Sequence, residues 1–118
     1  DVMHLGRELP LANSDEKMSK ALLTMTKKSF GCIGVLDKKK QIIGIITDGD
    51  LRRKLNSKFF DKKSSEIMTK NPTLANKSML VGEAINLMNT KKITSLFICD
   101  KKIPLGIVHI HDLLRLTS

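Results

Sequence analysis

The segment GIITDGD at residues 44–50 decides the fold of this chain, because its pattern returns as GIVHIHD at residues 106–112. Each copy runs from a glycine through two β-branched residues to a polar residue, and each ends on an aspartate. The flanking sequence repeats as well, since residues 21–53 match residues 84–115 with one residue fewer in the second copy's turn. A unit this small cannot bury a sufficient core alone. The repeat therefore predicts two copies packed about a pseudo-two-fold axis, with a cleft along it.

Each copy is predicted to run strand, helix, strand, strand, helix, which gives an α/β (α+β) fold. Hydrophobic periodicity and the turn residues between apolar runs set these elements. In the first copy we expect an extended segment at 9–11, a helix from a cap at Asp15 to residue 28, strands at 32–36 and 42–47, and a helix at 48–55. In the second we expect an extended segment at 71–74, a helix capped by Ser78, strands at 96–99 and 104–109, and a helix from residue 112. The copies are thus residues 1–55 and 66–118, and the polar, Lys-rich residues 56–65 are expected to be a linker.

Composition limits the classes of function. The chain has 118 residues, 41% of them hydrophobic, with no Trp or Tyr, which predicts one aliphatic globular core. Its net charge is +9, but the lysines fall in short clusters at predicted helix ends and turns. Aromatic stacking groups and an Arg-rich helix are missing, which favours a solvated surface over a nucleic-acid site. No apolar run of about 20 residues and no signal peptide are visible, so we expect a cytoplasmic protein without a membrane segment.

The cysteines and histidines give little support to a metal or disulfide site. Cys32 and Cys99 each lie inside an apolar run, where small buried thiols in a reducing compartment are expected. His109 and His111 are spaced as His-x-His with Asp112 adjacent, which suggests a metal. No third or fourth ligand follows at a diagnostic spacing, so no metal is predicted. A phosphate or sugar contact, or capping of the helix start, is the preferred interpretation of the two histidines.

The polar ending of each copy lies where a strand meets a helix. Helix N-termini attract phosphate, Thr47 can donate a hydroxyl to it, and Asp50 can accept hydrogen bonds from ribose hydroxyls. Gly44 carries no side chain and was expected to leave room for a ligand. The alternative is a capping box, in which Thr47 and Asp50 only satisfy the helix start. Two matched copies favour the ligand.

These features resemble the tandem CBS domain pair, or Bateman module, over essentially the whole chain. A narrower resemblance is to the C-terminal region of bacterial D-arabinose-5-phosphate isomerases. It is carried by ITDGDLRR at residues 46–53, MNTKKITSLF at 88–97 and HIHDLLR at 109–115. The resemblance implies that this chain is the regulatory part of such an isomerase, on the route to the lipopolysaccharide sugar Kdo. The catalytic sugar isomerase (SIS) domain would precede it.

The resemblance also implies which residues hold a ligand. Thr47 and Asp50 are the expected phosphate and ribose contacts of the first site, and Asp112 is the expected ribose contact of the second. His109 stands where the family has Thr or Ser, which favours a ligand with two unlike ends. The base is expected against residues 9–11, 31–33, 72–74 and 94–96. The full set of expected ligand contacts is Thr47, Asp50, His109, His111, Asp112, Thr73, Ser95, Cys32 and Arg53.

The expected ligand is a regulatory adenosine nucleotide or a CMP-sugar such as CMP-Kdo, with no cofactor required. By resemblance, the partners are the SIS domain and a second CBS pair, in a tetrameric parent enzyme. No nucleophile with a paired base is visible, so catalysis is assigned to the parent and not to this chain. Two other functions remain open: a structural module that assembles the parent without a ligand, and a basic nucleic-acid-binding domain.

Overall fold

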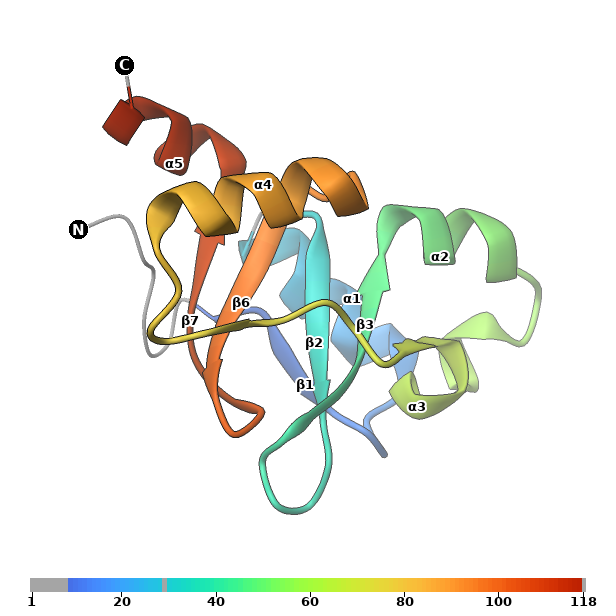
Figure 1. Cartoon of the computed structure of the whole chain (residues 1–118). Coiled ribbons are helices and arrows are strands. Elements are labelled where there is room, and N and C mark those ends of the chain that lie inside the picture. The colour runs from blue at the N-terminus through green and yellow to red at the C-terminus, as the bar shows by residue number, and fades with distance from the viewer. Residues whose placement is uncertain (1–8, 29, 118) are drawn as a thin grey trace. The chain divides into compact units, whose positions relative to one another are not determined.

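The computed structural model describes residues 9–28 and 30–117 of the chain. It divides into two compact units, with the boundary between Pro72 and Thr73. Each unit has its own sheet and its own helices (Figure 1). The described residues contain two sheets and five α-helices, so the predicted α/β class is confirmed.

The first unit is a four-stranded sheet in the order β1-β2-β3-β4 with helices around it. β1 runs parallel to β2, whereas β2–β3 and β3–β4 are antiparallel pairs. Its elements in chain order are β1 (Leu11–Asn13), α1 (Met18–Lys28), β2 (Cys32–Leu36), β3 (Ile42–Thr47), α2 (Asp48–Lys54), the 3-10 helix η2 (Phe59–Asp61), α3 (Ser64–Ile67) and β4 (Thr69–Lys70).

The hydrophobic pattern explains these elements. Every residue of β2 is buried, whereas buried and half-buried residues alternate along β3, as a strand with one covered face requires. Met18, Ala21 and Met25 recur at helical spacing on α1 and form its buried face. These three side chains pack with Ile33, Ile46 and other residues in one core cluster. The predicted helix and strands of this copy are therefore confirmed.

The Lys-rich segment 56–65, expected to be a linker, contains residues that pack against the first unit. Phe59 and Ser64 are fully buried, and the core cluster includes Phe59. The Ser64 N–H donates to the Glu16 carbonyl at 2.8 Å. The Lys62 carbonyl accepts from the N–H of Met18 at 2.9 Å. This bond serves the start of α1, so Asp15, three residues before the helix, is not its cap. Nothing in the sequence indicated that Phe59 is buried, because most of the residues around it are polar or charged.

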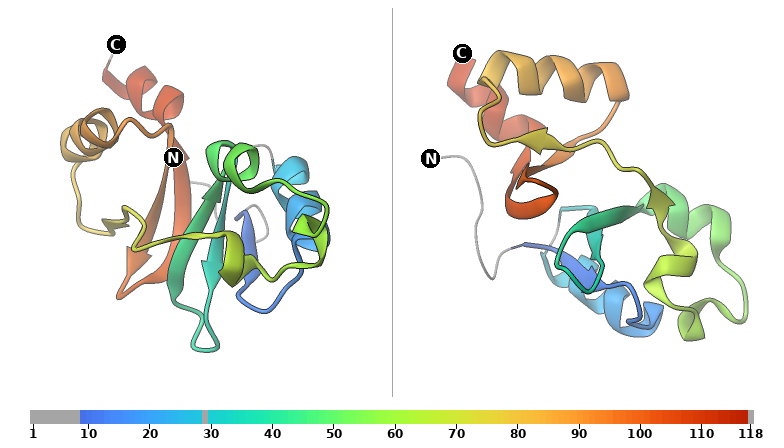
Figure 2. Two further views of the ribbon diagram at one scale, coloured as in Figure 1. Left: turned by 90° about the vertical axis from the view of Figure 1, so that its right-hand side faces the viewer. Right: turned by 60° about the horizontal axis from the view of Figure 1, so that its bottom comes forward.

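The second unit is a three-stranded sheet in the order β5-β6-β7, with β5 parallel to β6 and β6 antiparallel to β7. Its elements are β5 (Ala75–Asn76), α4 (Val81–Lys91), β6 (Ser95–Asp100), β7 (Ile103–His109) and α5 (Ile110–Thr117). α4 and α5 lie next to each other on one side of the sheet (Figure 2). Ala84 and Met88 of α4 share a core cluster with Leu113 of α5 and Val108 of β7.

The start of α4 differs from the sequence prediction. Ser78 does not cap the helix, because its N–H and hydroxyl both donate to the Asn76 side chain, at 2.9 and 2.6 Å. The helix begins at Val81, and the Glu83 carboxylate accepts from the N–H of Leu80 at 3.0 Å. An Asx turn and a carboxylate reaching back thus replace the expected serine cap.

Candidate functional site

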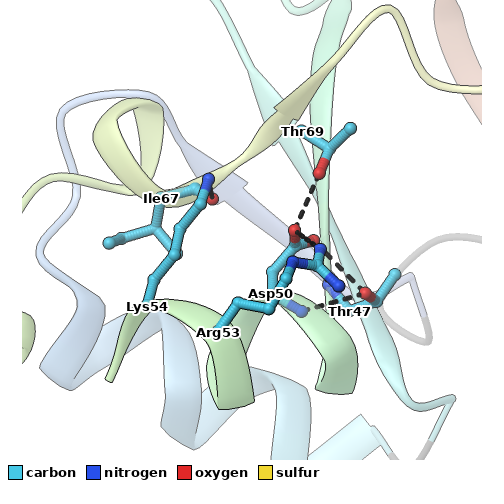
Figure 3. A network of polar contacts seen from close by, with 6 residues as sticks. All are labelled: Thr47, Asp50, Arg53, Lys54, Ile67 and Thr69. Carbon is cyan, nitrogen blue, oxygen red and sulfur yellow. Dashed lines mark hydrogen bonds and ion pairs between the residues drawn. The ribbon is translucent and has the colours of Figure 1, made fainter. Parts of the chain in front are cut away.

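In the first unit, the strand-to-helix corner is closed by a capping box (Figure 3). β3 ends at Thr47 and α2 begins at Asp48. The Thr47 hydroxyl accepts from the N–H of Asp50 at 3.4 Å, and Asp50 Oδ2 accepts from the N–H of Thr47 at 3.0 Å. The capping interpretation of this motif is therefore present in the structure. A ligand role for the same residues stays a prediction.

The Asp50 carboxylate is buried, with 1% of the residue exposed, and it accepts four hydrogen bonds. Oδ1 accepts from the Thr69 hydroxyl at 2.7 Å and from Arg53 Nη2 at 2.6 Å. Oδ2 accepts from the N–H and, at 3.2 Å, from the hydroxyl of Thr47. Burial alone raises the pKa of Asp50, but the hydrogen bonds from Thr69 and Thr47 and the charge of Arg53 outweigh it and hold the pKa below 3.8. The carboxylate is therefore ionised and fully engaged within the unit.

Cys32 lies beside this corner, because it pairs with Thr47 across β2 and β3. Burial and the nearby charge of Asp48 raise the pKa of its thiol to about 12. Cys99 in the second unit is also buried, which raises its pKa to about 11. Both thiols are protonated at neutral pH and are poor nucleophiles. The expectation that both cysteines are buried is confirmed.

Gly44 does not leave room for a ligand, contrary to the sequence prediction. A Cβ built at Gly44 would overlap Sδ of Met68 and lie 2.9 Å from the Cβ of that residue. Met68 directly precedes β4, the strand that pairs with β3 at Gly44. The missing side chain at Gly44 therefore admits Met68, and the space is filled by the protein itself.

The corner of the second unit is built around histidine. Ser95 pairs with His109 across β6 and β7, as Cys32 pairs with Thr47 in the first unit. His109 Nδ1 accepts from the N–H of His111 at 3.1 Å, so its ring caps α5. The two imidazole rings stack with centroids 4.8 Å apart. With Nδ1 as the acceptor, a neutral His109 carries its proton on Nε2, which is a donor.

Asp112 holds the position that Asp50 holds in the first unit, but its surroundings differ. Its side chain is 22% exposed, and Oδ1 lies 3.5 Å from Arg115 Nη1. An arginine three residues further along the helix pairs with each aspartate, as Arg53–Asp50 and Arg115–Asp112. Asp112 therefore presents part of its carboxylate at the surface, whereas Asp50 does not.

The structure sorts eight of the nine expected contacts into two groups of four, one in each unit. Thr47, Asp50, Arg53 and Cys32 meet at the first corner, and Ser95, His109, His111 and Asp112 meet at the second. Thr73 opens this stretch of the second unit, two residues before β5. Sequence reasoning missed Thr69, which lies outside the repeated span, so the comparison of the two copies gave no signal for it.

Two further findings concern residues 9–28 and 30–117. No helix among them is long and apolar enough to span a membrane. No three His, Cys, Asp or Glu side chains in this part of the chain come together as a metal site would require.

Comparison with known proteins gives one consistent family. The chain is 45% identical over 116 residues to the uncharacterized protein RP505 of Rickettsia prowazekii. It is 38% identical over 117 residues to arabinose 5-phosphate isomerase KdsD of Yersinia pestis. Each match covers 98% of this chain but 36% of the relative, so the chain spans about a third of their length.

Among solved structures, the crystal structure of CBSX2 in complex with AMP superposes with a TM-score of 0.82 at 23% identity. That match covers 99% of this chain and 92% of the other. The sequence profile of the CBS domain matches residues 1–57 and 65–118. The chain therefore belongs to the CBS domain family, and it carries two copies of the domain.

Proposed function

We propose that this chain is a regulatory module that binds an adenine nucleotide at its strand-to-helix corners. The observation that carries the proposal is the repeated corner itself. In both units a strand ends on a side chain that caps the following helix, and an aspartate lies in the first turn of that helix. The likeness to CBSX2, whose crystal structure contains AMP, supports an adenine nucleotide.

The second corner has the chemistry that a nucleoside monophosphate needs. The eight-residue helix α5 begins at the corner, and the positive end of its dipole favours a phosphate there. The Nε2–H of His109 adds a donor, and the exposed part of Asp112 can accept from ribose hydroxyls. We propose that Ser95 and Thr73 contact the base in this unit, and that His111 contacts the phosphate. The net charge of +9 favours anionic ligands generally.

The first corner is proposed to contact the ligand through Thr47, Asp50 and Arg53, with Cys32 beside the base. These roles follow the repeat, because each residue matches or adjoins a position at the second corner. In the longer protein implied by the relatives, we propose that nucleotide binding modulates an isomerase domain acting on arabinose 5-phosphate. The support is the 38% identity to KdsD over almost the whole chain.

Thermal unfolding with AMP, ATP, CMP and CMP-Kdo tests the ligand. We expect AMP or ATP to stabilise the chain by about 2.7 kcal/mol at 100 times its dissociation constant. Asp112→Asn should reduce this shift, because it removes a charged acceptor for the ribose hydroxyls. Asp61→Asn, the same change at an exposed residue of η2, should leave it unaltered. A larger shift with CMP-Kdo than with AMP would make the ligand a nucleotide sugar, and no shift with any of the four would contradict the proposal.

A structural role is the second candidate, favoured by exposed apolar side chains on the helices. Leu23 on α1 is 70% exposed and Leu80 at the start of α4 is 69% exposed. Such side chains are common at contacts between subunits. Light scattering of the chain with Leu23→Gln and Leu80→Gln tests this role, which predicts loss of self-association without any change in nucleotide binding.

A further inference from the structure

The Asp50 network ties α2 to the segment that leads into β4 (Figure 3). Asp50 accepts from Thr69, 19 residues further along the chain. Lys54 Nζ donates to the carbonyl of Ile67 at 2.7 Å. Two polar contacts from one short helix therefore hold residues 67–69 in place, in addition to the pairing of Thr69 with Ile45 of β3.

The acceptor sites of Asp50 are all in use. A carboxylate offers about four lone-pair sites, and Asp50 accepts four hydrogen bonds. A ligand hydroxyl can reach Oδ2 only by displacing the hydroxyl of Thr47 or its backbone N–H. It can reach Oδ1 only by displacing Arg53 or Thr69.

Thr69 is the donor that matters most for this exchange. The Arg53 side chain is 65% exposed, so its guanidinium can turn into solvent and be rehydrated at low cost. Thr69 is held by its place on β4, where its backbone pairs with β3. Thr69 is also exposed, so its hydroxyl can leave Oδ1 by rotation of its own side chain, while β4 keeps the residue beside Asp50.

We propose that the Thr69 hydroxyl is an internal substitute for a ligand hydroxyl at Asp50, so that a ligand hydroxyl and Thr69 compete for this carboxylate. The inference rests on the proposed function, and the ligand class is one with free hydroxyls, such as a ribonucleotide. It makes Thr69 a residue that sets affinity at the first corner.

Two consequences follow. The second corner, where 22% of Asp112 is exposed, binds the ligand before the first. Occupation of the first corner then releases Thr69 from α2. Because β4 ends at Lys70 and the first unit ends at Pro72, this release loosens the chain at the unit boundary.

The test isolates the first corner with Asp112→Asn and measures AMP binding by calorimetry. In that background we expect Thr69→Val to bind AMP about tenfold tighter, because an internal donor to an ionised group is gone. Thr90→Val, the same change at an exposed residue of α4, should leave the affinity unaltered. Dideoxyadenosine monophosphate, which lacks both ribose hydroxyls, should show no gain with Thr69→Val.

Equal affinities for the Thr69→Val and Thr90→Val chains would overturn the inference, as would a gain that persists with the dideoxy compound. If the Thr69→Val chain fails to fold, the inference is tested instead by hydrogen exchange of the Thr69 and Lys70 amides in the Asp112→Asn chain. Saturating AMP should speed their exchange, and unchanged or slower exchange would overturn the inference. AMP binding to the unsubstituted chain is measured first. If the unsubstituted chain does not bind AMP, both the proposed function and this inference are contradicted. If it binds AMP but Thr69→Val has no effect, only this inference is contradicted.

Discussion

Asp50 in the first unit and Asp112 in the second occupy matching positions of the repeat, yet one is 1% exposed with four hydrogen bonds and the other 22% exposed beside Arg115. The cause lies outside the repeat. Thr69 and Met68 belong to a segment that follows the first copy and packs back onto its sheet. A long-range contact can therefore bury the aspartate of one copy, while the matching aspartate of the other copy stays partly exposed.

The largest expected difference between the units is in stability. Asp50→Asn should destabilise the chain by about 3 kcal/mol, because it removes a buried charge on which Thr69, Arg53 and Thr47 converge. Asp112→Asn should cost less, because water reaches both the Asp112 side chain, which is 22% exposed, and that of Arg115, which is 78% exposed. Urea unfolding measures both changes. Similar losses of unfolding free energy for the two variants would show that Asp50 contributes no more to stability than Asp112.

A second contrast uses one glycine from each unit. Gly44→Ala should destabilise by about 2 kcal/mol, because the new methyl group overlaps Met68. Gly82→Ala should stabilise by up to about 1 kcal/mol, because Gly82 lies in α4 with nothing within 4 Å of a Cβ.

A double substitution in the same unfolding experiment tests whether Met68 is the cause of the Gly44→Ala effect. Combining Gly44→Ala with Met68→Ala should cost less than the sum of the two single changes, because the overlap is then relieved. Additive losses would mean that Met68 is not what excludes a side chain at Gly44.

Whether a feature could be predicted from the sequence depends on how far apart along the chain the interacting residues lie. The strands and the α1 helix depend on patterns within a few residues, such as the alternation along β3, and they were predicted correctly. The Thr47–Asp50 spacing predicted both a cap and a ligand contact, since both need polar side chains at the helix start. Thr69, Met68 and Phe59 act across long separations, and no repeat or local period marks them. The long-range contacts at the first corner could therefore not be predicted from sequence.

Acid should weaken the first unit through Asp50. Its pKa in the folded chain lies below the ordinary 3.8, so its ionised form contributes stability that is fully present above about pH 4. That contribution is lost as the pH falls through the folded-state pKa. The stability difference between the wild type and Asp50→Asn should therefore narrow on acidification, in urea titrations from neutral pH to about pH 3. Gly82→Ala changes no ionisable group, so its difference from the wild type should stay constant.

The smallest expected effect separates the two buried thiols. Burial raises the pKa of both, but only Cys32 also feels a nearby carboxylate, that of Asp48. Asp48→Asn should therefore shift the pH dependence of Cys32 alkylation by iodoacetamide toward lower pH, and Cys99 in the same molecule serves as the control. Mass mapping of the labelled peptides at several pH values measures both. Faster opening of the first unit would multiply the Cys32 rate equally at every pH, so a uniform increase would mean that Asp48 acts on helix α2 and not on the thiol.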